Sequence, residues 1–215
     1  MKNRNTEKGY YDIDVDFEEI LADNGMIDGL FYLKDLKQRK LHLNGEIDQF
    51  VIEDTVKHIL QFNREDAGIP AEERKPILLY VTSNGGSVDA GFELIDVIMC
   101  SKTPVYTINL GFQYSMGFLV GLAGHKRFAT KNAKYLIHDG SNLVWNSGAK
   151  AQDQMEFYKR VDTRIRDFIL SRGKITEREY DKKLRVEWYL FADEAKEKGF
   201  VDYIIGEDCD VDDIV

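Results

Sequence analysis

The stretch that decides the fold is YVTSNGGSVDAGFELIDVI, residues 80–98. It continues an apolar run over residues 76–82, which has the length and content of a strand buried on both faces. The Gly85-Gly86 pair then ends the strand, and residues 88–101 have helical spacing with one apolar stripe: Val88, Phe92, Ile95 and Met99. A buried strand that enters a helix through a tight turn is the repeating unit of an α/β layer fold.

The same alternation continues on both sides of this unit. Strands are predicted at residues 40–45, 103–111, 126–130 and 134–140, and helices at 47–63 and 150–172. A short apolar helix is predicted to begin at Ser115. The long helix is expected to end at Gly173 and to turn one row of side chains inward: Tyr158, Val161, Ile165 and Phe168. No composition break suggests a second core, so we expect a single α/β domain.

Composition excludes several classes of partner and cofactor. The net charge of −9 speaks against nucleic acid or an anionic membrane surface as a partner. Cys100 and Cys209 cannot form a disulfide framework, and neither they nor the four histidines have metal-ligand spacing. No apolar run is long enough for a membrane span or resembles a signal peptide. We therefore expect a cytoplasmic protein with no metal, no cofactor and no membrane contact.

Three features could carry chemistry, and each also has an ordinary structural explanation. Ser115 follows a buried strand at the start of a helix, where its hydroxyl could cap the helix or act as a nucleophile. His138 ends a strand and could be a surface residue or a general base. Gly86 belongs to a turn, but its N–H and that of Met116 could together bind an oxyanion. Each motif alone leaves both interpretations open.

Taken in chain order, four blocks resemble the proteolytic subunit of the Clp protease, the ClpP family. The blocks are SNGGSVDAG (83–91), GFQYSMGFLV (111–120), YLIHDG (135–140) and WYLFADEAKEKGFVDYII (188–205). The resemblance runs from about Arg39 to Ile205. It implies a ClpP/crotonase-like fold, in which stacked ββα units form a head and a long helix with a strand forms a handle. A single ClpP-like domain would span residues 39–215, with the handle at about 140–172, after a divergent acidic segment at the entrance, residues 1–38.

The resemblance also implies an activity. It is that of an ATP-dependent Clp protease subunit, a serine endopeptidase that cleaves unfolded polypeptides by acyl transfer inside a chamber. Ser115 would be the nucleophile and His138 the general base, with the amides of Gly86 and Met116 as oxyanion donors. The chain would assemble into heptameric rings, stacked as a tetradecamer, and would work with an AAA+ unfoldase or with a ClpP paralogue.

The chain departs from the family pattern close to this site. Glu187 stands where the family has the aspartate of its triad, and Asp181 and Asp193 are fallback residues for that role. Gln113 and Tyr114 replace a small pair before the nucleophile and are expected to reshape the substrate pocket. Two other functions therefore stay open: a catalytically weak or inactive ClpP-like structural or regulatory subunit, and a crotonase-type acyl-CoA enzyme.

Overall fold

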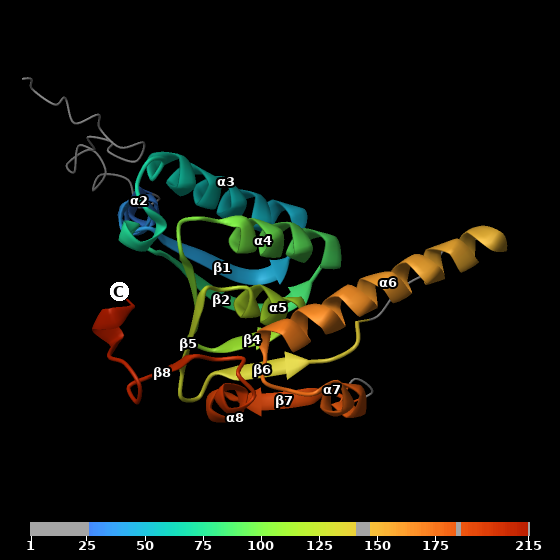
Figure 1. Cartoon of the computed structure of the whole chain (residues 1–215). Coiled ribbons are helices and arrows are strands. Elements are labelled where there is room, and N and C mark those ends of the chain that lie inside the picture. Colours follow the sequence, from blue (N-terminus) through green and yellow to red (C-terminus); the bar gives the residue numbers. More distant parts are fainter. Residues whose placement is uncertain (1–25, 141–146, 184–185, 215) are drawn as a thin grey trace, which may run out of the picture.

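The computed structural model describes residues 26–140, 147–183 and 186–214. In this part of the chain, eight strands form one sheet in the order β7-β6-β4-β2-β3-β5-β8, and β1 also pairs with β2. Helices α3 and α4 lie side by side along β1 and β2, and α5 packs between α4 and the sheet (Figure 1). The predicted α/β fold class is confirmed.

The strands and helices have the following bounds. The strands are β1 (Lys40–Ile47), β2 (Ile77–Gly86), β3 (Val105–Asn109), β4 (Phe112–Tyr114), β5 (Lys126–Thr130), β6 (Lys134–Ile137), β7 (Trp188–Phe191) and β8 (Tyr203–Ile205). The helices are α2 (Met26–Lys37), α3 (Gln49–Glu65), α4 (Val88–Cys100), α5 (Met116–Leu122), α6 (Ala149–Arg172), α7 (Glu177–Lys183) and α8 (Ala192–Glu197). Short 3₁₀ turns lie at Ala71–Glu73 and Val211–Asp213. Within the described residues, the strands and helices predicted by residue range are present, with ends that move by a few residues.

The directions of the strands determine which strand ends meet at the same edge of the sheet. Every pairing in the described sheet is parallel except that of β6 with β7, which is antiparallel. The carboxyl ends of β2, β4 and β6 therefore meet at one edge, where open α/β sheets characteristically bind ligands. Because β7 runs the other way, its amino end reaches the same edge.

The predicted stripe of α4 is only partly correct. Ile95 is buried, but Val88 and Phe92 are half-buried and Met99 is exposed. The face of α4 that packs into the core is centred on other residues: Ala90, Gly91, Leu94 and Ile98. The predicted stripe instead points along the flank of α4 that faces α6, where Phe92, Ile95 and Met99 line a cavity of about 650 Å³.

Helix α6 projects away from the body of the molecule (Figure 1). It ends at Gly173 as predicted, whose N–H donates to the Ile169 carbonyl. Its predicted inward row is half-buried at best, and Ile169 is its one buried residue in the described chain. Part of the expected handle, residues 141–146, lies outside the described residues. Most of the expected entrance segment, residues 1–25, also lies outside them, and its last part forms α2.

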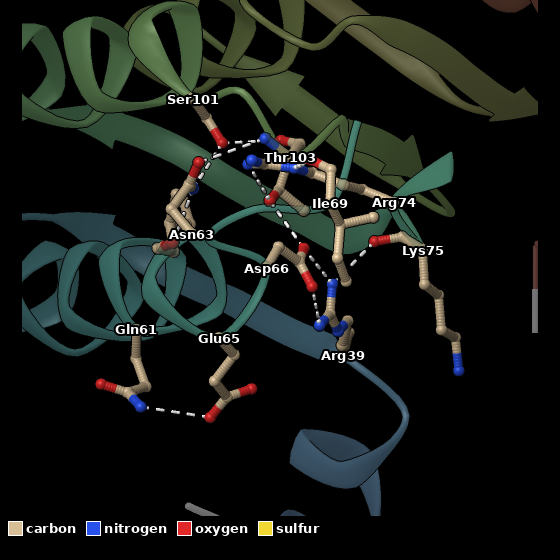
Figure 2. A network of polar contacts seen from close by, with 11 residues as sticks. Arg39, Gln61, Asn63, Glu65, Asp66, Ile69, Arg74, Lys75, Ser101 and Thr103 are labelled. Atoms are coloured by element: carbon tan, nitrogen blue, oxygen red, sulfur yellow. Dashed lines mark hydrogen bonds and ion pairs between the residues drawn. The ribbon is translucent and has the colours of Figure 1, made fainter. Parts of the chain in front are cut away.

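A buried ion pair joins the start of β1 to the end of α3 (Figure 2). Arg39 donates to both carboxylate oxygens of Asp66, at 2.6 and 2.7 Å, and Thr103 Oγ1 donates to the same carboxylate at 2.7 Å. Burial alone would raise the pKa of Asp66, but the hydrogen bonds from Arg39 and Thr103 outweigh it and lower the pKa below 3.8. Asn63 Oδ1 accepts from the N–H groups of Lys102 and Thr103, which fixes the chain ahead of β3.

The Asp66→Asn variant is expected to lose about 3 kcal/mol of unfolding free energy, because it leaves the buried Arg39 guanidinium without its counter-charge. The stabilisation by Asp66 is complete above about pH 5, because the unfolded carboxyl has an ordinary pKa. It is lost as the pH falls through the lowered folded-state pKa. Urea unfolding from pH 3 to pH 7 measures both effects. The neighbouring exposed Glu65→Gln is the control, and an equal loss in that control would contradict the assignment.

Candidate active site

Ser115 sits on a strained turn between β4 and α5. Its φ of +54° and ψ of −122° place a residue with a side chain in a region that such residues rarely adopt. Its N–H donates to the Leu136 carbonyl of β6 at 2.8 Å, which holds the turn against the sheet. The Ser115 side chain makes no capping hydrogen bond to α5. Capping therefore does not account for the hydroxyl at this position.

The Gly85-Gly86 turn meets Ser115 from the end of β2. A Cβ atom at Gly85 would lie 2.7 Å from Ser115 Cβ and 3.0 Å from the Met116 nitrogen. Ser83 Oγ accepts the Gly85 N–H at 3.0 Å and fixes the turn from inside the core. Only a residue without a side chain allows the two segments to approach this closely. Ser83 was not identified from the sequence, because a small polar residue in a strand carries no motif.

Gly86 and Met116, the predicted oxyanion donors, lie on the two segments that meet here. A Cβ at Gly86 would lie 2.3 Å from the Ile47 carbonyl oxygen, so Gly86 packs on β1 while Gly85 faces the serine. The Met116 side chain fills the space over Gly91 in α4, which fixes the first turn of α5. Helix geometry gives the Met116 N–H no partner within α5. Convergence of the two N–H groups on one oxygen stays a prediction.

His138 follows the last residue of β6 and is half-buried. Tyr114 pairs with Leu136 across β4 and β6. Ser115 therefore comes one residue after this pair and His138 two residues after it, at the same edge of the sheet. On its inner side, His138 lines a cavity of only about 10 Å³ together with Ile137, Tyr180, Lys183 and Trp188. The structure therefore brings the predicted nucleophile and base to neighbouring positions.

Glu187 lies next to His138 in the register of the antiparallel pair. Ile137 pairs with Trp188, so the residues one step beyond that pair are His138 and Glu187. The Glu187 carboxylate is exposed and accepts a hydrogen bond from Tyr189 Oη at 2.9 Å. This hydrogen bond is the main cause of a raised pKa at Tyr189. Among the described residues, no hydrogen bond or ion pair joins Glu187 to His138, or His138 to Ser115.

The two fallback carboxylates have other partners. Asp181 Oδ1 lies 3.6 Å from Arg166 Nε of α6. Asp193 Oδ1 accepts a hydrogen bond from the Glu194 N–H in the first turn of α8. Of the three candidate acids, Glu187 is the one in register with His138. Tyr189 was not identified from the sequence, because a hydroxyl two residues from a carboxylate has no motif that marks it.

The two residues before Ser115 point to opposite sides of β4. Gln113 is buried, its side chain occupies the space over Gly121, and its Nε2 donates to the Val81 carbonyl at 3.4 Å. Tyr114 is half-buried and packs against Phe112 and, edge to face, against Tyr189. Only Tyr114 is therefore placed to alter a substrate pocket, and Gln113 fills the core.

The described ranges show two further properties of the chain. They hold no group of three or more His, Cys, Asp and Glu side chains that could bind a metal ion. None of the helices in them combines the length and the apolar character that crossing a bilayer requires.

The chain is similar to known proteins over most of its length. The family model described as Clp protease matches residues 28–208. The ATP-dependent Clp protease proteolytic subunit 2 of Treponema pallidum is 31% identical over 186 residues, which cover 86% of this chain and 90% of the relative. The protein of the same name from Treponema denticola is 30% identical over 173 residues, which cover 80% of this chain and 84% of the relative.

The Gly85→Ala variant tests the close approach at Ser115. The added Cβ would lie 2.9 Å from the Tyr114 carbonyl oxygen as well as against Ser115, so it must push the two segments apart. We expect a loss of about 3 kcal/mol in unfolding free energy, measured by urea denaturation.

Gly45→Ala is the matched control for this prediction. Gly45 has a similar φ, +106° against +99° at Gly85, but no atom within 4 Å of its Cβ position. Gly45→Ala should lower the unfolding free energy only by the cost of holding alanine at a positive φ, about 1 kcal/mol. Equal losses in the two variants would show that conformation, and not contact with Ser115, limits residue 85.

Proposed function

This chain belongs to the Clp protease family, and we propose that it is a serine endopeptidase subunit that cleaves unfolded polypeptides by acyl transfer. The observation that carries the proposal is the meeting of the Gly85-Gly86 turn with Ser115, whose hydroxyl is not used to cap α5. A nucleophile and backbone N–H donors side by side are what acyl transfer requires.

In the proposed mechanism, His138 removes the proton of Ser115 Oγ as that oxygen attacks the substrate carbonyl. The N–H groups of Gly86 and Met116 bind the oxyanion that forms. His138 then gives its proton to the leaving amine, and a water molecule, activated by the same imidazole, hydrolyses the acyl-enzyme. Glu187 accepts the other N–H of His138 and stabilises the imidazolium, with one methylene more than the aspartate of the family pattern.

We further propose that the chain acts within an assembly of heptameric rings, stacked as a tetradecamer. Helix α6 exposes Met155 and Phe157 by 52% and 50%, and the 650 Å³ cavity beside Phe157 is lined by both apolar and charged side chains. Exposed apolar surface beside a cavity is typical of an interaction site. An AAA+ unfoldase would supply unfolded polypeptide in the cytoplasm, where both free cysteines would remain reduced.

One observation favours the second candidate, an inactive or weak subunit that assembles with an active paralogue. The Glu187 carboxylate is bound to Tyr189 and not to His138, so the acid is not engaged with the base. No specific observation among the described residues favours an acyl-CoA enzyme, and membership of the Clp protease family speaks against it.

A serine-reactive fluorophosphonate separates the active from the inactive subunit. We expect covalent labelling of Ser115, found by mass spectrometry of the digested protein, and hydrolysis of a fluorogenic peptide. Ser115→Ala should abolish labelling and lower kcat/KM about 1,000-fold or more, because the nucleophile is lost. The exposed Ser171→Ala is the control and should retain both signals. Assembled wild-type protein that is not labelled on Ser115 would leave the inactive subunit as the function.

Native mass spectrometry tests the assembly. We expect species of seven or fourteen times the chain mass of 24.8 kDa. Phe157→Asp should shift them to smaller species, because it places a charge in the apolar surface of α6. Thr163→Asp adds the same charge at an exposed position of α6 that does not line the cavity, and it should leave the assembly intact. A wild-type monomer at every salt and protein concentration would contradict the proposal.

A further inference from the structure

Tyr189 and Glu187 form a pair on the exposed face of the sheet edge that carries the proposed catalytic residues. Successive residues of a strand point to opposite faces. Trp188 and Leu190 are buried, whereas Glu187 and Tyr189 are exposed and share the outer face. Their hydrogen bond, at 2.9 Å, therefore runs along the strand and not across it to β6.

The other possible partner of the carboxylate is His138, which like Glu187 lies one residue beyond the last pair of the β6–β7 ladder. The pairing of Ile137 with Trp188 puts His138 and Glu187 one step further along the same ladder. Opposed residues of an antiparallel pair have Cβ atoms about 5 Å apart, which a glutamate can span to reach a histidine ring. Glu187 is thus within reach of two donors, and in this structure it is bound to the Tyr189 hydroxyl.

Tyr189 is itself held by the strained turn. Its ring meets that of Tyr114 edge to face, with centroids 6.2 Å apart and an interplanar angle of 88°. Tyr114 immediately precedes Ser115 and pairs with Leu136, which in turn pairs with Tyr189. The hydroxyl that binds Glu187 is therefore positioned by the same three strands that position the nucleophile.

From this geometry we propose that Tyr189 is a positioning residue that holds Glu187 away from His138, so that the acid joins the triad only when the Tyr189 hydrogen bond is released. The proposal rests on the proposed function and adds to it a residue that sets how often the triad is complete. Because a carboxylate neighbour stabilises the imidazolium, His138 is the stronger base when Glu187 is bound to it. Tyr189 therefore restrains the activity of the resting subunit.

The test is Tyr189→Phe, which removes the hydroxyl and keeps the ring on Tyr114. Loss of one exposed hydrogen bond should raise kcat for a fluorogenic peptide about 2- to 10-fold, with KM nearly unchanged. The rate of fluorophosphonate labelling at Ser115 should rise by the same factor. Tyr80→Phe is the matched control, since it removes a hydroxyl that donates to the Ile214 carbonyl at 2.7 Å on another part of the sheet, and it should leave kcat unchanged.

The pH dependence of kcat/KM tests the positioning role of Tyr189, because a purely structural role of this residue would leave it unchanged. Within the described residues, the titratable groups around His138 are Asp139 beside it, Tyr180 and Lys183 from α7, and Glu187 directly before β7. Tyr189→Phe alters only the partner of Glu187. The acidic limb of kcat/KM should therefore move to higher pH, because Glu187 then stabilises the protonated imidazolium of His138. Adding Glu187→Gln should remove both the shift and the gain in kcat.

Different outcomes separate this inference from the function on which it rests. If Ser115 is labelled in the wild type but Tyr189→Phe has an unchanged or lower kcat and the same acidic limb, Tyr189 does not restrain the acid and the inference is wrong. If neither protein is labelled while both assemble, the subunit is not an active peptidase, and the proposed function and the inference fail together. Unchanged urea midpoints for Tyr189→Phe, expected because Tyr189 is 55% exposed, exclude misfolding as the cause.

Discussion

The structure of the candidate site depends on one close contact, that of the Gly85 backbone with Ser115. A side chain at residue 85 would overlap Ser115 Cβ and come within 3.0 Å of the Met116 nitrogen, so the end of β2 can meet the start of α5 only because residue 85 has none. Ser83 fixes the glycine turn from the core side, and the Ser115 N–H is held by Leu136 of β6. The strained φ of Ser115 is therefore imposed by two neighbouring strands and not by its own helix, whose N-terminus its hydroxyl does not cap.

Strand direction extends this contact to the other residues of the site. Parallel pairing of β4 with β6 puts His138 just past the position opposite Ser115, at the same edge. Strand β7 is antiparallel to β6, so its amino end, and not its carboxyl end, lies at this edge of the sheet. Glu187, directly before β7, is therefore placed beside His138. The proposed nucleophile, base and acid thus lie, in chain order, at the ends of β4 and β6 and at the start of β7.

Much of this arrangement could be predicted from the sequence, and the failures have physical reasons. Buried strands and a glycine pair have strong local patterns, so the α/β class followed from residues close together in the chain. The meeting of Gly85-Gly86 with the distant Ser115 was instead expected from the resemblance to the ClpP family. The stripe of α4 was misplaced because spacing gives a helical face but not the neighbour it packs on: Phe92 and Met99 line the cavity beside α6, while Leu94 and Ile98 meet the core. The role of Glu187 was located by resemblance, but its contact with Tyr189 depends on which face of β7 is exposed, and neither residue alone signals that.

The two unusual features of β7 have to be considered together. A glutamate at residue 187 has one methylene more than the aspartate of the family pattern, which lengthens its reach along the strand as well as across it. A hydroxyl at residue 189 offers the longer side chain a donor on its own strand, and the ring that carries this hydroxyl rests on Tyr114 beside the nucleophile. Exposed hydrogen bonds differ by little in free energy. If His138 is the second donor, as proposed, small changes in the packing of β7 on β6 are enough to move the exposed carboxylate from one donor to the other. Helix α7 precedes β7 in the chain, and its Tyr180 and Lys183 line the cavity behind His138. Any force that shifts α7 against β6 therefore acts on the acid and the base of the proposed triad at once.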